Sequence, residues 1–405
     1  MRPVSHNLYT VRCRMAQAAL KLGNYFMGYH TPQCLEGAGA VTRLPALLAK
    51  LGLRNVLVVT GAHLMSRGLT QPMLDAMDRA KIQYTVYSMG HPDPSTDDVE
   101  AGYRLFKSHG CRAIVALGGG SRIDCAKAIA AKSVHPRKKI TQLQGLLKVH
   151  RRIPPLFAIP TTAGAGSETT VAAVIIDSAT HHKASINDPA LIPQYAVLDP
   201  VLTAELPPRA TAATGMDALS HAVEAYTNQT YNTPLEDRLA RQAVRLIYKN
   251  LLPAFHNGSD LEARQNMQRA AFAAGRAFTR GGVGYVHAIG HTLGGLYGVP
   301  HGEAMAILLP AVMRAYGPAV HRRLGELADV CGIAGANDAE KAGRFLDWIE
   351  GLRAQTGLGD RLDMVRAEDI DQMITWAMAE ANPVYPVPVI WQREQFRSLI
   401  ESLRS

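Results

Sequence analysis

The distribution of hydrophobic and polar positions divides the chain into two parts. From residue 44 to about residue 200, short apolar runs alternate with amphipathic segments, whereas helical periodicity dominates from Pro208 to the end. Strands that alternate with helices are typical of a parallel sheet with crossover connections. A helical period without strands is typical of an all-α domain. We therefore predict an α/β domain at residues 31–205 and an all-α domain at residues 206–405.

The individual elements follow from the period of each segment. Apolar runs predict buried strands at residues 55–60, 83–87 and 113–117 and from residue 156 onward, and amphipathic runs predict helices at residues 44–51, 73–80 and 97–109. Further helices are predicted at residues 210–226, 235–252 and 261–278. Because ligands of parallel α/β sheets bind beyond the carboxyl ends of the strands, residues that directly follow the strands are candidates for a binding site.

Residues 1–30 form an extension before the first domain. Its segment 12–26, RCRMAQAALKLGNYF, has the pattern of a basic amphipathic helix, and the first thirty-five residues contain no acid. A transit peptide has this kind of composition. The alternative is an extra helix that packs on the surface or against a partner subunit, and we favour it because the enrichment in Ser and Arg is thin.

Two pairs of potential metal ligands stand four residues apart in the helical part. His287 and His291 form one pair, and Asp217 and His221 form the other. Residues at this spacing share one face of a helix. His301 follows a Val-Pro pair and precedes a glycine, which predicts a loop or the start of a new helix. Together these residues offer more imidazole groups than a single buried core histidine would explain, and imidazole is the commonest metal ligand.

One carboxylate and three imidazoles would form the ligand set of this site. Asp217, His221, His287 and His301 supply them. This set suits divalent iron, with zinc as the alternative, and it needs no thiolate. His291 is then left facing the site without being required as a ligand.

A glycine-rich run follows the predicted strand at residues 113–117. Gly118, Gly119, Gly120 and Ser121 form this run, and a helix starts directly after it. Glycines let the backbone approach an anion, and the free amides at a helix start can donate to that anion. By itself GGGS is as typical of a turn, but its place between a strand and a helix favours a phosphate cradle.

The two histidine-containing segments resemble the iron-dependent alcohol dehydrogenases, a metal-activated family that includes lactaldehyde reductase and 1,3-propanediol dehydrogenase. The resemblance covers roughly residues 33–400. It implies a dehydroquinate synthase-like architecture of two domains and a homodimer or a larger homo-oligomer. It also implies that Asp217, His221, His287 and His301 hold the metal and that His291 lies beside the substrate.

The cofactor segments resemble this family as well. The run GGGSRIDCAKAIA is similar to its GGGS-x-x-D-x-x-K signature, and PTTAGAGSE is similar to its P-T-T-x-G-x-G-S-E loop. This resemblance implies that Gly118, Gly119, Gly120, Ser121, Asp124, Thr161 and Thr162 bind a nicotinamide dinucleotide. One departure is Arg122, where family members often carry proline. Arg122 either adds a cation near the pyrophosphate or faces the solvent.

Gly61 is a second departure from the family pattern. NAD-preferring relatives commonly carry an aspartate at this position, which binds the ribose hydroxyls and repels a 2′-phosphate. Glycine removes both the attraction and the repulsion, so we expect the chain to accept NADPH as well as NADH. The alternative is that Gly61 is only a turn residue and that cofactor preference is set elsewhere. The predicted cofactor is therefore NADP or NAD.

Composition narrows the class of protein further. The 405 residues are 47% hydrophobic and 19% charged, which is typical of a globular protein. No apolar run reaches the roughly eighteen residues of a membrane span. The five cysteines never form a C-x-x-C pair, which favours a reducing compartment, the cytoplasm, or an organelle if the extension is a transit peptide. The net charge of +9 comes without the motifs or interleaved aromatics of nucleic-acid binding, so it indicates anionic cofactors instead.

The resemblance implies hydride transfer between a short-chain alcohol or diol and the nicotinamide, with a metal as Lewis acid. His291 is the candidate proton relay, because the pKa of an imidazole lies near neutrality. We expect the active site in the cleft between the two domains. Two alternatives stay open: a dehydroquinate synthase-like lyase, which would show no net turnover of NAD(P)H, and a non-catalytic relative, which would bind neither metal nor cofactor.

Overall fold

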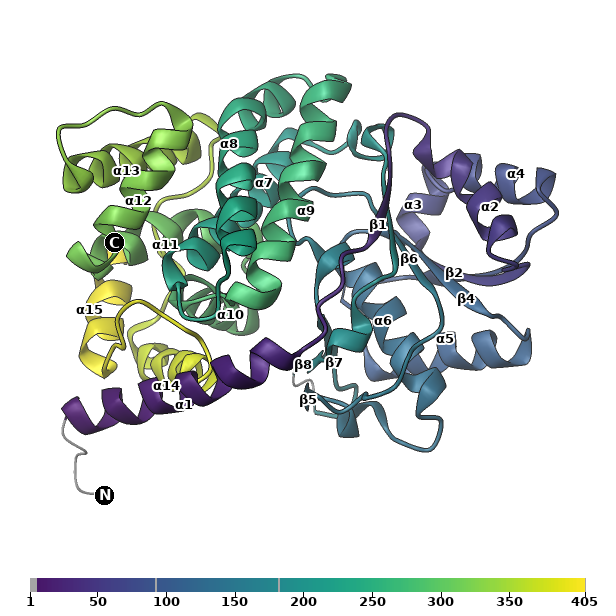
Figure 1. Ribbon diagram of the computed structural model, residues 1–405, viewed down its shortest axis with the longest axis horizontal. Coiled ribbons are helices and arrows are strands. Elements are labelled where there is room, and N and C mark those ends of the chain that lie inside the picture. The colour runs from purple at the N-terminus through teal and green to yellow at the C-terminus, as the bar shows by residue number, and fades with distance from the viewer. Residues whose placement is uncertain (1–5, 92, 181–182, 405) are drawn as a thin grey trace. The chain divides into compact units, whose positions relative to one another are not determined.

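A computed structural model describes residues 6–91, 93–180 and 183–404 of the chain (Figure 1). The chain forms two compact units. Of the described residues, the α/β unit comprises those within Gly28–Leu206 and Ser259–Gln268, and the helical unit comprises those up to Met27, within Pro207–Gly258 and from Arg269 onward. The N-terminal helix thus belongs to the helical unit, although it precedes the α/β unit in the sequence.

The α/β unit is built on a six-stranded sheet in which all neighbouring strands are parallel. Its strands, in spatial order, are β1 (Gln33–Glu36), β9 (Tyr195–Leu198), β6 (Leu156–Pro160), β4 (Ala113–Gly118), β2 (Asn55–Gly61) and β3 (Gln83–Met89). A smaller sheet has the order β5 (Gly145–Leu146), β8 (Lys183–Asn187) and β7 (Ala172–Ile176). The predicted strands are confirmed, and β1, β5, β7, β8 and β9 were not predicted.

Helices cover both faces of the large sheet. They are α2 (Ala40–Lys50), α3 (Ala62–Ser66), α4 (Gln71–Arg79), α5 (Thr96–Ser108) and α6 (Gly120–Val134), with short 3-10 helices η1 (Ile140–Gln142), η2 (Ser167–Thr169), η3 (Pro189–Leu191) and η4 (Pro200–Thr203). Successive residues of a strand point to opposite faces. Accordingly Val56 and Val58 pack in one core with α2 and α4, whereas Leu57 and Val59 pack in the other with α5 and α6. Burial on both faces explains why these strands are continuous apolar runs.

The register of the central strands gathers the glycine-rich turns at one edge of the sheet. Val56 of β2 pairs with Ala113 of β4, and both strands run in parallel to a terminal glycine, Gly61 in β2 and Gly118 in β4. Gly118 in turn pairs with Pro160, the last residue of β6. The carboxyl ends of three neighbouring strands therefore meet at the edge where ligands of such sheets bind.

The second unit is helical, as predicted. Its elements are α7 (Pro208–Asn228), α8 (Pro234–His256), α9 (Leu261–Gly281, of which the first residues lie in the α/β unit), α10 (Tyr285–Tyr297), α11 (His301–Tyr316), α12 (Pro318–Cys331), α13 (Asp338–Gln355), η5 (Ala367–Asp369), α14 (Ile370–Ala381) and α15 (Arg393–Leu403). Helix α7 is buried along most of its length and packs against α8 and α11. It is the central helix of this unit.

The predicted N-terminal helix is present as α1 (His6–Phe26) and packs on the helical unit. Its contacts include hydrogen bonds: Arg14 donates from Nη1 to the carbonyl of Val387 at 2.8 Å and from Nη2 to that of Pro388 at 2.7 Å, and Gln17 Nε2 donates to the carbonyl of Tyr385 at 2.7 Å. The apolar side chains of α1 that stay exposed include Leu8, Val11, Met15, Leu22, Tyr25 and Phe26. Among the described helices, none has the length and apolar character that crossing a bilayer requires.

Candidate active site

Helix α7 presents three polar side chains to the interior of the helical unit. Asp217, His221 and Glu224 stand at positions i, i+4 and i+7, which place them on one face of the helix. All three residues are buried, with at most 5% of their surface exposed. A row of ionisable groups inside a helical core is costly unless each group finds a partner.

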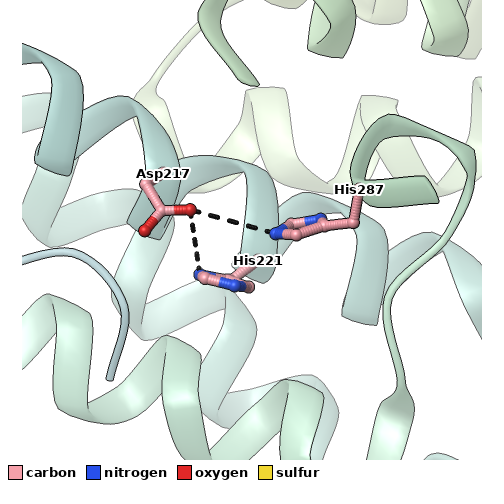
Figure 2. A group of neighbouring side chains, drawn as sticks. All are labelled: Asp217, His221 and His287. Carbon is pink, nitrogen blue, oxygen red and sulfur yellow. Dashed lines mark ion pairs between the residues drawn. The ribbon is translucent and has the colours of Figure 1, made fainter. Parts of the chain in front are cut away.

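His287 of α10 meets this row (Figure 2). Asp217 Oδ1 lies 3.7 Å from His221 Nδ1 and 3.9 Å from His287 Nε2. One ligand atom of each residue lies within 4.8 Å of the other two, so the three groups could share one ion. Residues of both predicted pairs, Asp217 and His221 from one and His287 from the other, therefore supply a common candidate site.

The atoms that face one another here have no hydrogen-bond partner. Asp217 Oδ1, His221 Nδ1 and His287 Nε2 are fully buried and unpartnered among the described residues. Buried polar atoms almost always have a partner, so three adjacent exceptions need an explanation. A divalent cation would satisfy all three at once, and a carboxylate with imidazoles is a set that suits iron or zinc. The residues present thus fit a metal ion.

The protonation states of these groups also suit a metal. Burial lowers the pKa of His221 to about 3 and lowers that of His287 well below its usual value, so both imidazoles are neutral at neutral pH. Burial opposes ionisation of Asp217, but the neighbouring imidazoles of His221 and His301 hold its pKa below the usual range. A carboxylate and neutral imidazoles are the forms that bind metal, because ligands must be deprotonated.

His301 approaches the same carboxylate from the first residue of α11. Its Nε2 lies 3.3 Å from Asp217 Oδ1, and 41% of its side chain is exposed. The sequence predicted a loop or a helix start at this position, and the helix start is confirmed. The fourth predicted ligand therefore lies at the exposed margin of the site, whereas the other three are buried.

Glu224 holds His287 in its orientation. Its Oε2 lies 2.5 Å from His287 Nδ1, and its Oε1 accepts a hydrogen bond from the amide of Val286 at 2.8 Å. A Cβ at Gly284 would lie 2.8 Å from Oε1, so the turn before α10 has to be glycine for the carboxylate to reach. Burial raises the pKa of Glu224 to about 7. The pair directs the other ring nitrogen of His287 toward Asp217.

We expect Glu224→Gln to weaken metal binding by about 10- to 100-fold, the usual effect of losing a partner that orients a metal ligand. The amide offers a single acceptor oxygen to two donors, Val286 N–H and His287 Nδ1–H. Titration with Zn²⁺ against a chromophoric chelator measures the affinity. Glu326→Gln, which removes the same charge on α12, is the control and should bind metal like the wild type. Equal affinities in both variants would contradict the orienting role.

His291 lies one turn after His287 and has a different partner. Its Nδ1 lies 2.7 Å from Glu380 Oε1 of α14, and this carboxylate also accepts a hydrogen bond from Tyr385 at 2.7 Å. The His291 side chain is 45% exposed, and its ring stacks with that of His301 at 5.4 Å between centroids. His291 thus adjoins the candidate ligands at the exposed side of the site. Phe278 stacks on His221 with ring centroids 4.0 Å apart.

The predicted cofactor residues come together in the α/β unit. Thr161 N donates to the carbonyl of Gly118 at 3.1 Å, which joins the loop after β6 to the end of β4. A Cβ on Gly119 would contact Thr162 at 3.6 Å, and one on Gly120 would lie 3.0 Å from Ser167 Oγ. Helix α6 starts here without a side-chain cap, so its first amides can donate to an anion. The cradle fits a dinucleotide phosphate.

Two further residues of the GGGS-x-x-D-x-x-K signature, Asp124 and Lys127, make hydrogen bonds that stabilise this region. Asp124 Oδ2 accepts a hydrogen bond from Val174 N of β7 at 3.0 Å. The buried Lys127 donates to the carbonyl and the hydroxyl of Thr170, both at 2.8 Å, and to the carbonyl of Ala172 at 2.9 Å. Burial lowers the pKa of Lys127 to about 8. Both side chains tie α6 to the segment that follows the threonine loop, and cofactor binding by Asp124 stays a prediction.

Comparison with known proteins connects both units to one family. A profile described as iron-containing alcohol dehydrogenase matches residues 31–200, and a profile described as the C-terminal part of the Fe-containing alcohol dehydrogenase family matches residues 211–403. The chain belongs to the iron-containing alcohol dehydrogenase family. This confirms the predicted family and its oxidoreductase class.

Members of this family are similar to the chain over most of its length. The NAD-dependent methanol dehydrogenase of Bacillus methanolicus is 38% identical, covering 86% of this chain and 91% of the relative. The 1,3-propanediol dehydrogenase of Klebsiella pneumoniae is 36% identical, covering 85% and 90%. A crystal structure of 1,3-propanediol oxidoreductase superimposes with a TM-score of 0.89 at 33% identity, covering 93% of this chain and all of the other. The predicted fold class is thereby confirmed.

Sequence analysis missed the two carboxylates that hold the histidines. Glu224 could have been found, because it continues the spacing of Asp217 and His221 along α7. Glu380 carries no such signal, because it meets His291 only through the packing of α14 against α10.

Proposed function

We propose that the chain catalyses NAD(P)-linked hydride transfer between a short-chain alcohol or diol and the corresponding aldehyde at a divalent iron centre. The convergence of three buried, unpartnered ligand atoms, Asp217 Oδ1, His221 Nδ1 and His287 Nε2, carries this proposal. Membership in the iron-containing alcohol dehydrogenase family supports it, as do relatives named for methanol and 1,3-propanediol.

Asp217, His221, His287 and His301 would hold the metal. We take the metal to be Fe²⁺, because the family to which the chain belongs is described as iron-containing. Zn²⁺ is the alternative, because a carboxylate with imidazoles binds both ions. When bound, the ion supplies Lewis-acid polarisation of the substrate oxygen, and the nicotinamide supplies or accepts the hydride. The partial exposure of His301 leaves the substrate an approach on that side of the ligand set.

His291 would carry the proton between the substrate oxygen and the solvent. Its side chain is half exposed and adjoins His301, so it can exchange protons with water on one side. The carboxylate of Glu380 orients the ring through Nδ1, and the pKa of an imidazole lies near neutrality, which suits a group that carries a proton. No nucleophilic side chain is required by this chemistry.

Gly118, Gly119, Gly120 and Ser121 would cradle the pyrophosphate, and Thr161 and Thr162 would contact the cofactor from the adjoining loop. The hydrogen bond from Thr161 N to the Gly118 carbonyl supports a joint surface of the two segments. A sulfoacetaldehyde reductase of Bifidobacterium kashiwanohense, 29% identical with a TM-score of 0.84 over 94% of this chain and 99% of its own, was solved with NAD⁺. This supports a nicotinamide dinucleotide as the ligand of the α/β unit.

A metal-dependent cofactor assay tests the proposal. The protein is purified without oxygen, stripped with a chelator and restored with Fe²⁺ or Zn²⁺, and the absorbance of NADPH and NADH is followed with propionaldehyde. We expect oxidation of the reduced cofactor only after metal is restored. Bound metal and bound cofactor without oxidation with any short aldehyde would contradict the proposed reaction.

We expect Gly61→Asp to shift the ratio of kcat/KM for NADPH over NADH toward NADH by about 100-fold or more. A carboxylate here would face the 2′-phosphate of NADPH, and two like charges in contact cost several kcal/mol. Each 1.4 kcal/mol corresponds to about a tenfold change in affinity. Its Cβ would also lie 2.9 Å from Arg122 Nε, so the new acid would pair with this cation. Steady-state kinetics with both cofactors measure the ratio, and an unchanged ratio would show that Gly61 does not set the preference.

A further inference from the structure

The side chain of Arg122 crosses the carboxyl edge of the sheet. Arg122 lies in the first turn of α6, and its Cγ would be 2.4 Å from a Cβ on Gly118, the last residue of β4. Its Nε and Nη2 would be 2.9 and 3.2 Å from a Cβ on Gly61, the last residue of β2. The arginine therefore extends from the phosphate cradle to the end of the next strand, and both strands end in the residue that leaves room for it.

In dinucleotide-binding sheets, the side chains near the adenosine ribose distinguish NAD from NADP. An acid at the end of the strand next to the phosphate-binding turn binds the ribose 2′-hydroxyl, whereas an arginine nearby accommodates a 2′-phosphate. Strands β2 and β4 are direct neighbours, and β2 ends without an acid. The chain thus carries the cation of this arrangement and lacks the acid.

We propose that Arg122 binds the 2′-phosphate of NADP(H) and that Gly61 provides the space for its guanidinium, so that the chain discriminates in favour of the phosphorylated dinucleotide. This inference rests on the proposed function, which requires only that some nicotinamide dinucleotide binds. It assigns a specificity-determining role to a residue outside the glycine cradle.

The electrostatic surroundings of Arg122 are compatible with an anionic ligand. Burial lowers the pKa of Arg122, and the carboxylates of Asp98 and Asp93 oppose this effect by favouring its charged form. Asp98 already accepts hydrogen bonds from the amide of Ser95 at 2.8 Å and from the hydroxyl of Tyr87 at 3.0 Å, and Asp93 lies 3.5 Å from Lys183 Nζ. Other donors thus share these acids with Arg122. A guanidinium binds phosphate through two parallel hydrogen bonds, and partial burial strengthens them.

Calorimetric titration of the full-length, metal-loaded protein with NADP⁺ and NAD⁺, without substrate, tests this role. The two probes differ by one phosphate group. We expect the wild type to bind NADP⁺ more tightly, and Arg122→Gln to weaken NADP⁺ binding by about 10- to 100-fold while changing NAD⁺ binding by less than about threefold. Arg122→Lys should recover part of the loss, because the charge remains. Arg104→Gln on α5, an exposed arginine of the same unit, controls for net charge and should bind both probes like the wild type.

Three outcomes would overturn the inference. If the wild type binds NADP⁺ and NAD⁺ equally, or if Arg122→Gln weakens both equally, Arg122 does not read the 2′-phosphate, and the proposed function stands unaffected. If the wild type binds neither, the nicotinamide part of the proposed function fails together with the inference. Melting curves of both Arg122 variants separate a lost contact from a lost fold.

Discussion

His287→Ala is expected to abolish metal retention and activity together. The imidazole offers one of three buried candidate ligand atoms that lie within 4.8 Å of one another, and alanine can donate nothing in its place. Loss of a direct ligand should exceed the 10- to 100-fold loss in affinity that is typical of outer partners. We therefore expect less than about a tenth of the wild-type iron content after gel filtration. Elemental analysis and NADH oxidation with propionaldehyde measure the two effects.

His291→Ala is the matched control for this experiment, because it removes an imidazole from the same helix one turn away. If His291 acts on the proton and not on the metal, its variant should keep the metal and lose turnover by about 10²- to 10⁴-fold, the usual contribution of a general acid or base. The ligand assignment would be wrong if His287→Ala kept stoichiometric iron with near-normal turnover. It would equally be wrong if the two variants lost metal to the same extent.

The parts of the site that could be predicted from the sequence are those fixed by local geometry. Asp217 and His221, like His287 and His291, stand one helical turn apart, so their common direction follows from the helix alone. The glycine cradle is likewise a single turn between a strand and a helix. Their assembly around one carboxylate oxygen depends on how α7, α10 and α11 pack. No spacing in the sequence encodes this packing, and none encodes that of α14 against α10, which is why the contact between His291 and Glu380 was missed.

The secondary structure, too, could be predicted only where the local sequence pattern is distinctive. Strands buried on both faces, such as β2 and β4, form continuous apolar runs and were predicted closely. Strand β1 is four residues long and partly exposed, so its sequence has no distinctive pattern. Helix α1 departs from the rule that an amphipathic helix buries its apolar side. Its buried face includes the polar Gln17 and Asn24 besides Cys13, and Arg14 and Gln17 donate to carbonyl groups near the C-terminal end of the chain. Hydrogen bonds to distant backbone override the local pattern.

Gly302→Ala is expected to destabilise the helical unit and to weaken metal binding, although alanine is the better helix former by about 1 kcal/mol. Gly302 is the second residue of α11, directly after the candidate ligand His301. A Cβ here would lie 2.1 Å from the carbonyl oxygen of Ala213 in α7, a contact with rigid backbone. The two helices would have to separate, and His301 would move away from Asp217, whose Oδ1 now lies 3.3 Å from its ring.

Overpacking of this kind costs about 1–3 kcal/mol, and the displaced ligand should lower metal affinity by about tenfold or more. Gly343→Ala is the matched control, because Gly343 lies inside α13 and a Cβ there would meet nothing within 4 Å. This control should raise the melting temperature slightly, as propensity predicts, and leave metal binding unchanged. Thermal melts of the metal-free proteins and Zn²⁺ titrations measure both effects. If Gly302→Ala behaved like Gly343→Ala, the close approach of α11 to α7 would not be what holds His301 beside Asp217.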